Sequence, residues 1–262
     1  NTTPKGDIEL RGSTGRMERL PTLRIEGVHD FTCGMRVFLN KYSRKLVTRA
    51  DNLVSESGGD PEMKTPAQET LKALENDTLL GTSGRMWISN QQVTWKVILD
   101  HYHENADSYL AEMEAADNEG PGTLELNPDM EIPDYTKHEI HIQPGGYVGD
   151  PFAGHLYQYG TLSFYNGVMG DNTQDQIHVS TANRLPLPED GIVKRILVQG
   201  CGPGQMTVAL AERFPDAEIW GIDVGGPLVR YAHMRARDLG VPVNFAQRLA
   251  EDTKFPDNYL MY

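Results

Sequence analysis

Three glycines spaced one residue apart follow an apolar run in ILVQGCGPG, residues 196–204. A short apolar run that ends in glycines is typical of a buried strand turning tightly into a helix. Glycines suit such a turn because a Cβ atom would keep a ligand away from the backbone at the helix N-terminus. The next residues, QMTVALAERF, have the spacing of an amphipathic helix. This stretch therefore predicts a backbone cradle for a ligand.

A carboxylate ends the next predicted strand, AEIWGID, at Asp223, 23 positions after Gly200. In an open α/β sheet, an acidic side chain at the carboxyl end of the second strand can hydrogen-bond a ribose diol. A dinucleotide site needs the pattern G-x-G-x-x-G, and Gln205 stands where its last glycine would be. The glycines of this chain instead follow the pattern G-x-G-x-G.

The segment from Lys194 to Asp257 resembles the cofactor half of class I S-adenosylmethionine-dependent methyltransferases. ILVQGCGPG is similar to the first motif of that family, IWGIDV to the second, and NFAQRLAEDTKFPDN to the segment after the third strand. The resemblance covers about a quarter of the chain. It implies that the protein binds S-adenosyl-L-methionine, methylates an oxygen, nitrogen or carbon of a small-molecule acceptor, and releases S-adenosyl-L-homocysteine.

The resemblance also implies which residues contact the cofactor. The glycine turn would lie against its methionine and ribose parts, and Asp223 would bind the ribose hydroxyls. Val224, Ala250 and Glu251 would lie near the adenine ring. The implied cofactor-binding residues are Gln199, Gly200, Cys201, Gly202, Gly204, Asp223, Val224, Leu249, Ala250 and Glu251.

Two positions depart from the family pattern. Gln199 stands where an acidic residue is usual, so its contact with the methionine amino group would be neutral and weaker. Leu249 replaces a common aspartate, which puts a hydrogen bond to the adenine amino group in doubt. A non-catalytic, methyltransferase-like binding subunit therefore stays an alternative. A dinucleotide-dependent oxidoreductase is a further alternative, which Gln205 disfavours.

The aromatic and glycine-rich segment 143–167 supplies the candidates for the acceptor side. Segments before the first strand commonly close over the cofactor in this family, so we expect a lid or a pocket wall here. The alternative is a compact loop whose aromatic rings pack between two domains. His155 is the candidate general base, because histidine titrates near neutral pH. The predicted substrate-binding residues are Tyr147, Tyr157, Tyr159 and Tyr165.

Two pairs of histidines were considered as metal ligands. His101 and His103 would lie on different faces of a helix, and His138 and His141 would point to opposite faces of a strand. Neither pair converges, and no cysteine lies nearby in the sequence. We therefore predict no metal site.

The apolar periodicity predicts a helical N-terminal region over residues 1–120, beginning with an irregular arm over 1–27. Residues 121–190 carry many prolines, glycines and aromatic residues, which predicts an irregular lid or linker. Residues 191–262 alternate between strand and helix and predict the start of a Rossmann-like, doubly wound α/β sheet. The predicted helices span 28–53, 65–76 and about 90–119.

The last five residues, NYLMY, would begin the fourth of the seven strands usual in the family. A parallel sheet that stopped there would leave a hydrophobic edge open. We therefore expect the sequence to be part of a longer protein.

The composition indicates which classes of binding partner and which cellular compartment to expect. The 262 residues include 37 acidic and 24 basic side chains, a net charge of -13, which disfavours binding to nucleic acid. No apolar run reaches the roughly 18 residues of a membrane span. Two cysteines far apart, Cys33 and Cys201, suggest a reducing, cytoplasmic compartment. The sequence leaves the oligomeric state open, with a homo-oligomer as one expectation.

Overall fold

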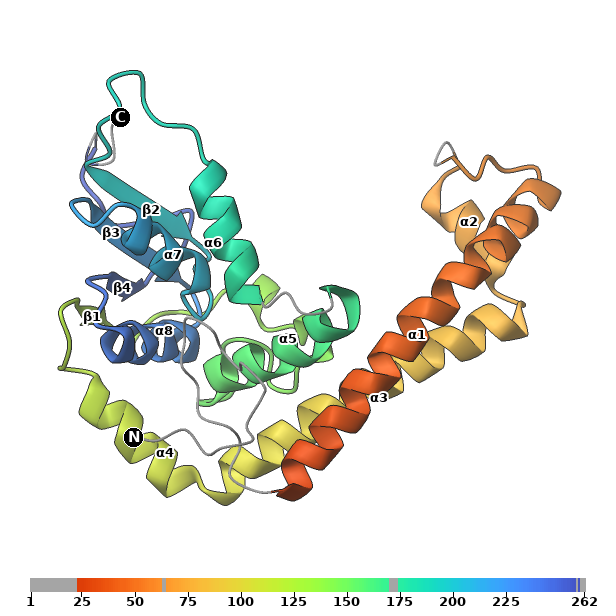
Figure 1. Cartoon of the computed structure of the whole chain (residues 1–262), viewed down its shortest axis with the longest axis horizontal. Coiled ribbons are helices and arrows are strands. Elements are labelled where there is room, and N and C mark those ends of the chain that lie inside the picture. Colours follow the sequence, from red (N-terminus) through yellow and green to blue (C-terminus); the bar gives the residue numbers. More distant parts are fainter. Residues whose placement is uncertain (1–22, 63–64, 170–173, 258, 260–262) are drawn as a thin grey trace, which may run out of the picture.

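A four-stranded parallel sheet joins three strands from the C-terminal part of the chain to one strand at residues 124–125 (Figure 1). The computed structural model describes residues 23–62, 65–169, 174–257 and 259. In the sheet the strands lie in the order β1-β4-β3-β2. Their bounds are Leu124–Glu125 for β1, Arg195–Gln199 for β2, Glu218–Asp223 for β3 and Asn244–Gln247 for β4. The predicted α/β class with an incomplete Rossmann-like sheet is confirmed.

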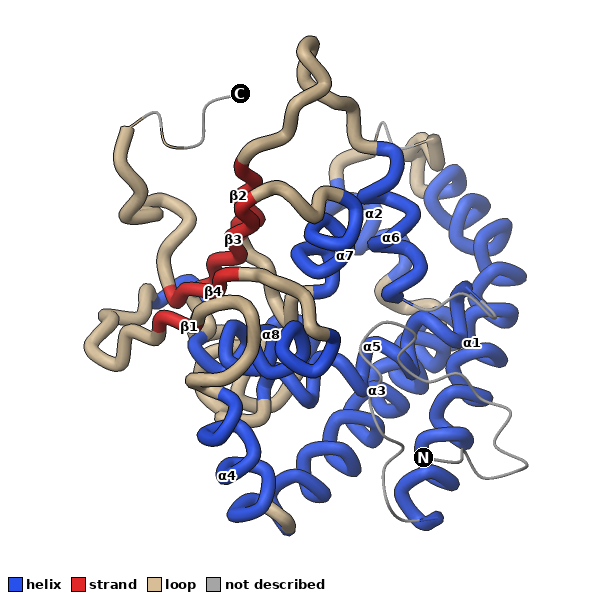
Figure 2. The backbone as a smooth tube through the Cα atoms, turned by 60° about the vertical axis from the view of Figure 1, so that its left-hand side comes forward, coloured by secondary structure: helices blue, strands red, loops and turns tan. Residues whose placement is uncertain are grey.

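The two helices that connect these strands pack on one face of the sheet. They are α7, Gln205–Arg213, and α8, Gly226–Leu239. Ile196 pairs with Ile219 across the sheet, and both side chains join a buried cluster to which α7 and α8 contribute. Right-handed crossovers that move in one direction along a sheet place both helices on the same side. Figure 2 shows the strands as a ladder with α7 and α8 on that side.

Strand β1 comes from the segment that we expected to be irregular. Leu124 pairs with Phe245 of β4, and the Phe245 N–H donates to the Thr123 carbonyl at 2.8 Å. Gly122 lets the two backbones meet, because a Cβ there would lie 1.8 Å from the Val243 oxygen. The segment before the methyltransferase-like motifs therefore completes one edge of the sheet.

A helical arm carries the N-terminal part of the described chain (Figure 1). Helices α1, Leu23–Glu56, and α3, Thr78–Glu104, pack side by side, with the short α2, Ala67–Leu74, near the tip. The first two predicted helices are confirmed. The predicted irregular arm over residues 1–27 lies mostly outside the described residues, and α1 begins within it at Leu23.

The third predicted helix has the wrong bounds. It begins at Thr78, because the Asp77 side chain accepts a hydrogen bond from the Leu80 N–H at 2.9 Å and caps this end. It ends at Glu104, and a separate helix, α4, runs over Ala106–Ala116. Asn105 between them has non-helical backbone angles, with φ of -120°.

The expectation of an irregular segment over 121–190 is also wrong. Two helices lie in it, α5 over Ala153–Met169 and α6 over Gln174–Arg184. Two of the glycines that suggested a loop, Gly154 and Gly160, are packing positions within α5. A Cβ at Gly154 would lie 2.3 Å from the Tyr231 Cβ of α8, and a Cβ at Gly160 would lie 1.8 Å from the Trp95 ring of α3. Helix α5 therefore crosses two other helices at unusually close range.

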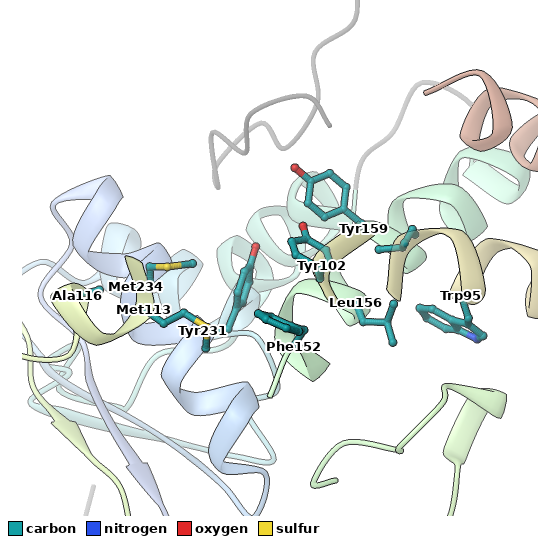
Figure 3. Close-up of a cluster of buried hydrophobic side chains, with 10 residues drawn as sticks. Trp95, Tyr102, Met113, Ala116, Phe152, Leu156, Tyr159, Tyr231 and Met234 are labelled. Carbon is teal, nitrogen blue, oxygen red and sulfur yellow. The ribbon is translucent and has the colours of Figure 1, made fainter. Parts of the chain in front are cut away.

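The helical region and the sheet region share a core (Figure 3). One buried cluster takes side chains from α3, α4, α5 and α8. Helix α8 therefore packs on the sheet with one face and on the helical region with the other. The cluster consists of Trp95, Ile98, Tyr102, Met113, Ala116, Phe152, Leu156, Tyr159, Tyr231 and Met234.

Within the described residues, no helix is long and apolar enough to span a membrane.

Candidate functional site

The glycine turn between β2 and α7 has a left-handed backbone at all three glycines. The φ angles of Gly200, Gly202 and Gly204 are 65°, 54° and 82°, values that residues with a Cβ adopt only with strain. A Cβ at Gly204 would lie 2.9 Å from the Ala232 Cβ, so this glycine is needed for packing. A Cβ at Gly200 or Gly202 would meet nothing within 4 Å. These two positions leave the backbone bare, as a ligand cradle requires.

The carboxylate of Asp223 fastens this turn to the end of β3. Its Oδ2 accepts a hydrogen bond from the Gly202 N–H at 3.0 Å, and its Oδ1 accepts one from the Gly225 N–H at 2.8 Å. Burial raises the pKa of Asp223, while these N–H donors oppose the rise. Each carboxylate oxygen keeps a second lone pair. Asp223 can therefore accept further hydrogen bonds from a diol placed across the turn.

The loop after β4 lies beside the same carboxylate. The Arg248 N–H donates to the Asp223 carbonyl at 3.0 Å. From the end of β2, Gln199 Nε2 donates to the Ala250 carbonyl at 3.4 Å. Val224 is joined to the loop because its carbonyl accepts from Gln247 Nε2 at 3.1 Å. The fold thus gathers the predicted cofactor residues from three strand ends.

A cavity of about 580 Å³ lies between this loop and the segment after β1. Leu249 lines it from the loop, and Asn127 and residues 129–134 line it from the segment after β1. Its size lies within the range of small-molecule sites, about 300–1,000 Å³. Glu251 is exposed, and its carboxylate accepts a hydrogen bond from the Tyr135 hydroxyl at 2.6 Å. The segment after β1 therefore closes over the residues predicted to contact adenine.

The side chain of Cys201 does not face this site. Its thiol is buried in the cluster that joins the sheet to α7 and α8, and burial raises its pKa. A buried, protonated thiol is a poor ligand and a poor nucleophile. Only the backbone of Cys201 is left for the predicted contact with the cofactor.

One of the predicted acceptor-side tyrosines, Tyr147, lies close to Asp223, and a second, Tyr157, packs against it. The Tyr147 and Tyr157 rings meet edge to face with centroids 5.7 Å apart. The Tyr147 backbone oxygen lies against Gly225, where a Cβ would approach it to 2.7 Å. Burial, Tyr157 and the Asp223 charge together raise the pKa of Tyr147. The structure therefore brings Tyr147 close to the predicted ribose carboxylate, with Tyr157 packed against Tyr147.

His155 and Tyr159 lie elsewhere, in the core shared by the helices. The imidazole of His155 is enclosed by Tyr102 and Tyr231, with ring centroids 4.8 and 4.6 Å away. Burial lowers the pKa of His155 to about 3. This placement does not fit the predicted general base, because the ring is sealed from an acceptor and resists protonation.

Tyr159 packs in the same cluster, beside Tyr102 (Figure 3). It is 5% exposed, so its predicted contact with a substrate does not fit its position either. Tyr165 belongs to α5, but its side chain lies outside the part of the chain that the structure describes.

Two polar contacts near the site did not follow from the sequence. The Tyr147 hydroxyl lies 2.6 Å from Nδ1 of His141, for which the sequence indicates no role at this site. At the start of α7, Gln205 Nε2 donates to Gln158 Oε1 of α5 at 2.7 Å, and both side chains are buried. In the sequence analysis, Gln205 matters only because it replaces the last glycine of a dinucleotide-binding pattern. Neither pair has a local signal, because the partners come from separate turns or helices.

Over the described ranges, no group of three or more histidine, cysteine, aspartate or glutamate side chains could hold a metal ion.

Comparison with known families identifies the segment that holds the turn. A family model described as "Methyltransferase domain" matches residues 196–261, from β2 through the loop after β4. This part of the chain is therefore a methyltransferase domain by its match to the family model. The glycine turn, Asp223 and the loop after β4 all lie inside this methyltransferase domain.

Two curated relatives match parts of the chain. Trans-aconitate 2-methyltransferase of Rhodococcus jostii is 45% identical over 47 residues, which are 18% of this chain and 18% of the relative. Demethylmenaquinone methyltransferase of Thermus thermophilus is 38% identical over 64 residues, which are 24% of this chain and 29% of the relative. The chain thus spans less than a third of the length of either relative. No solved structure matches it.

Proposed function

We propose that this protein binds S-adenosyl-L-methionine across the glycine turn and transfers its methyl group to a small-molecule acceptor. S-adenosyl-L-homocysteine is the second product. The observation that carries the proposal is the bare backbone of Gly200 and Gly202 beside the Asp223 carboxylate. A bare turn at a helix N-terminus suits the polar end of the cofactor, and the carboxylate suits its ribose.

Each part of the site has a proposed role. Asp223 accepts hydrogen bonds from the ribose hydroxyls, and the turn backbone holds the methionine part. Val224 and the loop after β4 hold the adenine ring, with Tyr135 fixing Glu251. The proposed cofactor-binding residues are Gln199, Gly200, Cys201 through its backbone, Gly202, Gly204, Asp223, Val224, Leu249, Ala250 and Glu251.

The chemistry needs alignment more than it needs a reactive side chain. The bound sulfonium supplies an activated methyl group. The protein holds the acceptor in line with the carbon–sulfur bond and excludes water from the reacting atoms. Tyr147 and Tyr157 form the proposed wall for the acceptor, because Tyr147 lies close to Asp223 and Tyr157 packs against Tyr147.

A small acceptor fits the available facts better than a polymer. The names of the two relatives specify trans-aconitate and demethylmenaquinone, both small molecules. The net charge of -13 would repel a nucleic acid phosphate backbone.

The first test is calorimetric titration of the purified protein with S-adenosylmethionine and S-adenosylhomocysteine, with NAD as the control ligand. We expect micromolar binding of the two sulfur compounds and none of NAD. The absence of binding, in protein shown to be folded by circular dichroism, would refute the proposal.

A screen of small acceptors with methyl-labelled cofactor follows the titration. Transfer of the label to an acceptor supports an enzyme. Cofactor binding without transfer to any acceptor would favour a non-catalytic binding subunit.

A further inference from the structure

A histidine and a tyrosine form a hydrogen-bonded pair at the edge of the proposed acceptor site. Nδ1 of His141 lies 2.6 Å from the hydroxyl of Tyr147. His141 is exposed to solvent, and Tyr147 is half-buried beside Asp223 and Tyr157. The pair therefore connects bulk water to the place where the proposed acceptor would lie.

The backbone at this pair is strained. His141 has φ of 58° and ψ of 21°, and Ile142 has φ of 51°, both in the left-handed region. A residue with a side chain is strained in this conformation and keeps it only where its surroundings hold it. Two side chains of α3 hold the backbone of His141 in this conformation. Gln91 Nε2 and Trp95 Nε1 both donate hydrogen bonds to the His141 carbonyl, at 2.5 and 3.1 Å.

A buried side chain, Gln143, also fixes the loop between His141 and Tyr147. Gln143 is fully buried, and its Nε2 donates to the carbonyls of Gly146 and Ala153, at 3.0 and 3.3 Å. Gly145 and Gly146 both adopt positive φ, which turns the chain back toward His141. These hydrogen bonds and glycine turns fix the conformation of the loop, and this conformation places the His141 imidazole next to the Tyr147 phenol.

We propose that His141 and Tyr147 act together to take the proton from a hydroxyl group of the acceptor. Tyr147 contacts the acceptor, and His141 is a positioning residue that acts through Tyr147. This inference rests on the proposed methyl transfer, and it deepens that proposal by assigning an oxygen acceptor with an ionisable hydroxyl.

The proposed methyl transfer and proton transfers take place in one step. The acceptor oxygen forms a bond to the methyl carbon, and the carbon–sulfur bond breaks with its electron pair left on sulfur. The acceptor proton passes to the Tyr147 oxygen as the Tyr147 proton passes to Nδ1 of His141. The imidazolium then releases a proton to water, which reaches His141 because that side chain is exposed.

The test compares His141→Asn and Tyr147→Phe with the unaltered protein. Asparagine tolerates the left-handed backbone and still accepts a hydrogen bond from Tyr147, but it does not take up a proton. Phenylalanine keeps the ring of Tyr147 and removes only its hydroxyl, so it tests the pair even if the first variant folds poorly. His138→Asn is the matched control, because His138 is an exposed histidine three positions earlier.

The probes are phenol, para-nitrophenol and benzoate, each with labelled S-adenosylmethionine. Phenol enters with its proton, para-nitrophenol is largely ionised at mildly alkaline pH, and benzoate is ionised throughout. We expect both site variants to lower kcat for phenol by about 10²–10⁴-fold, the usual range for general-base catalysis. We expect little change in kcat for the two ionised probes, and an unchanged KM for the cofactor.

Loss of activity that is equal for all three probes, or no loss at all, would overturn the inference while leaving the proposed function intact. Methyl transfer confined to acceptors without a hydroxyl proton would overturn it too. If the unaltered protein fails to bind S-adenosylhomocysteine, the proposed function itself fails, and the calorimetric titration distinguishes that case.

Discussion

At the scale of single residues, burial decides what His155 can do. Burial lowers its pKa from 6.5 to about 3, so the imidazole is neutral in the folded protein. The unfolded chain binds this proton as the pH falls through 6.5, whereas the folded chain does not until about pH 3. The contribution of His155 to stability is therefore present above pH 6.5 and is lost as the pH falls below it, by at most about 1.4 kcal/mol per pH unit.

We expect His155→Phe to reduce this sensitivity to acid. Phenylalanine suits the aromatic surroundings and replaces a ring nitrogen, Nδ1, that has no hydrogen-bond partner. Urea unfolding of both proteins, at one pH above 6.5 and at several below it, measures the effect. The free energy of unfolding should fall less steeply in the variant as the pH is lowered. Parallel pH curves for the two proteins would show that His155 is protonated while folded.

Asp223 offers the matching test of the cofactor site. Asp223→Asn replaces one accepting oxygen by a donor, which opposes both the ribose hydroxyls and a backbone N–H of the turn. We expect affinity for S-adenosylhomocysteine to fall by about 1.5–3 kcal/mol, since a hydrogen bond to a charged group is lost. Asp216→Asn is the control, because Asp216 is exposed and precedes the other end of β3. Calorimetric titration that gave equal affinities for both variants would remove Asp223 from the site.

At the scale of elements, helix α5 depends on two glycines. A Cβ at Gly160 would lie 1.8 Å from Trp95 Cζ3. Helices α3 and α5 would have to move apart to relieve this clash. We expect Gly160→Ala to lower the free energy of unfolding by about 1–3 kcal/mol or more. Gly84 in α3 is the matched position, because it is exposed and a Cβ there would meet nothing within 4 Å. Gly84→Ala should raise stability by about 0.5–1 kcal/mol.

Urea denaturation measures both glycine variants. Shifts of the same sign would show that α5 and α3 are farther apart than the structure places them.

These glycines also show why only part of the fold follows from the sequence. Strand β2, the glycine turn and Asp223 are predictable because their signals are local: an apolar run, a glycine spacing and an acidic residue at a strand end. Helix α5 is not, since Gly160 reads as a loop residue until Trp95, 65 positions earlier, is known to lie against it. Strand β1 has two residues, too few for any periodicity.

The candidate site divides in the same way. The proposed cofactor side rests on motif spacing, while the contact between His141 and Tyr147 depends on a left-handed backbone. Gln91 and Trp95 of α3 hold that backbone in place, so no local sequence pattern predicts the contact.

At the scale of the whole molecule, α8 joins the two regions through polar contacts as well as the shared core. Arg235 of α8 and Asp175 of α6 form a buried ion pair at 2.7 Å, with each side chain 1% exposed. Arg230 donates to both carboxylate oxygens of Asp117, which follows α4, at 2.7 Å. The predicted boundaries at residues 120 and 190 therefore mark changes in sequence character, and we propose that they do not mark independent folding units.

This proposal predicts that residues 191–262 do not fold by themselves. Tyr231 and Met234 would lose the cover of α4 and α5, and Arg235 would be left without Asp175. Uncovering this apolar face removes a burial free energy of several kcal/mol, comparable to the total stability of a small domain. We expect the segment alone to give poorly dispersed amide resonances and no cooperative urea transition, whereas the full chain unfolds cooperatively. A dispersed spectrum together with binding of S-adenosylhomocysteine by the segment alone would contradict the prediction, because the methyltransferase domain would then need none of the helical region to form its site.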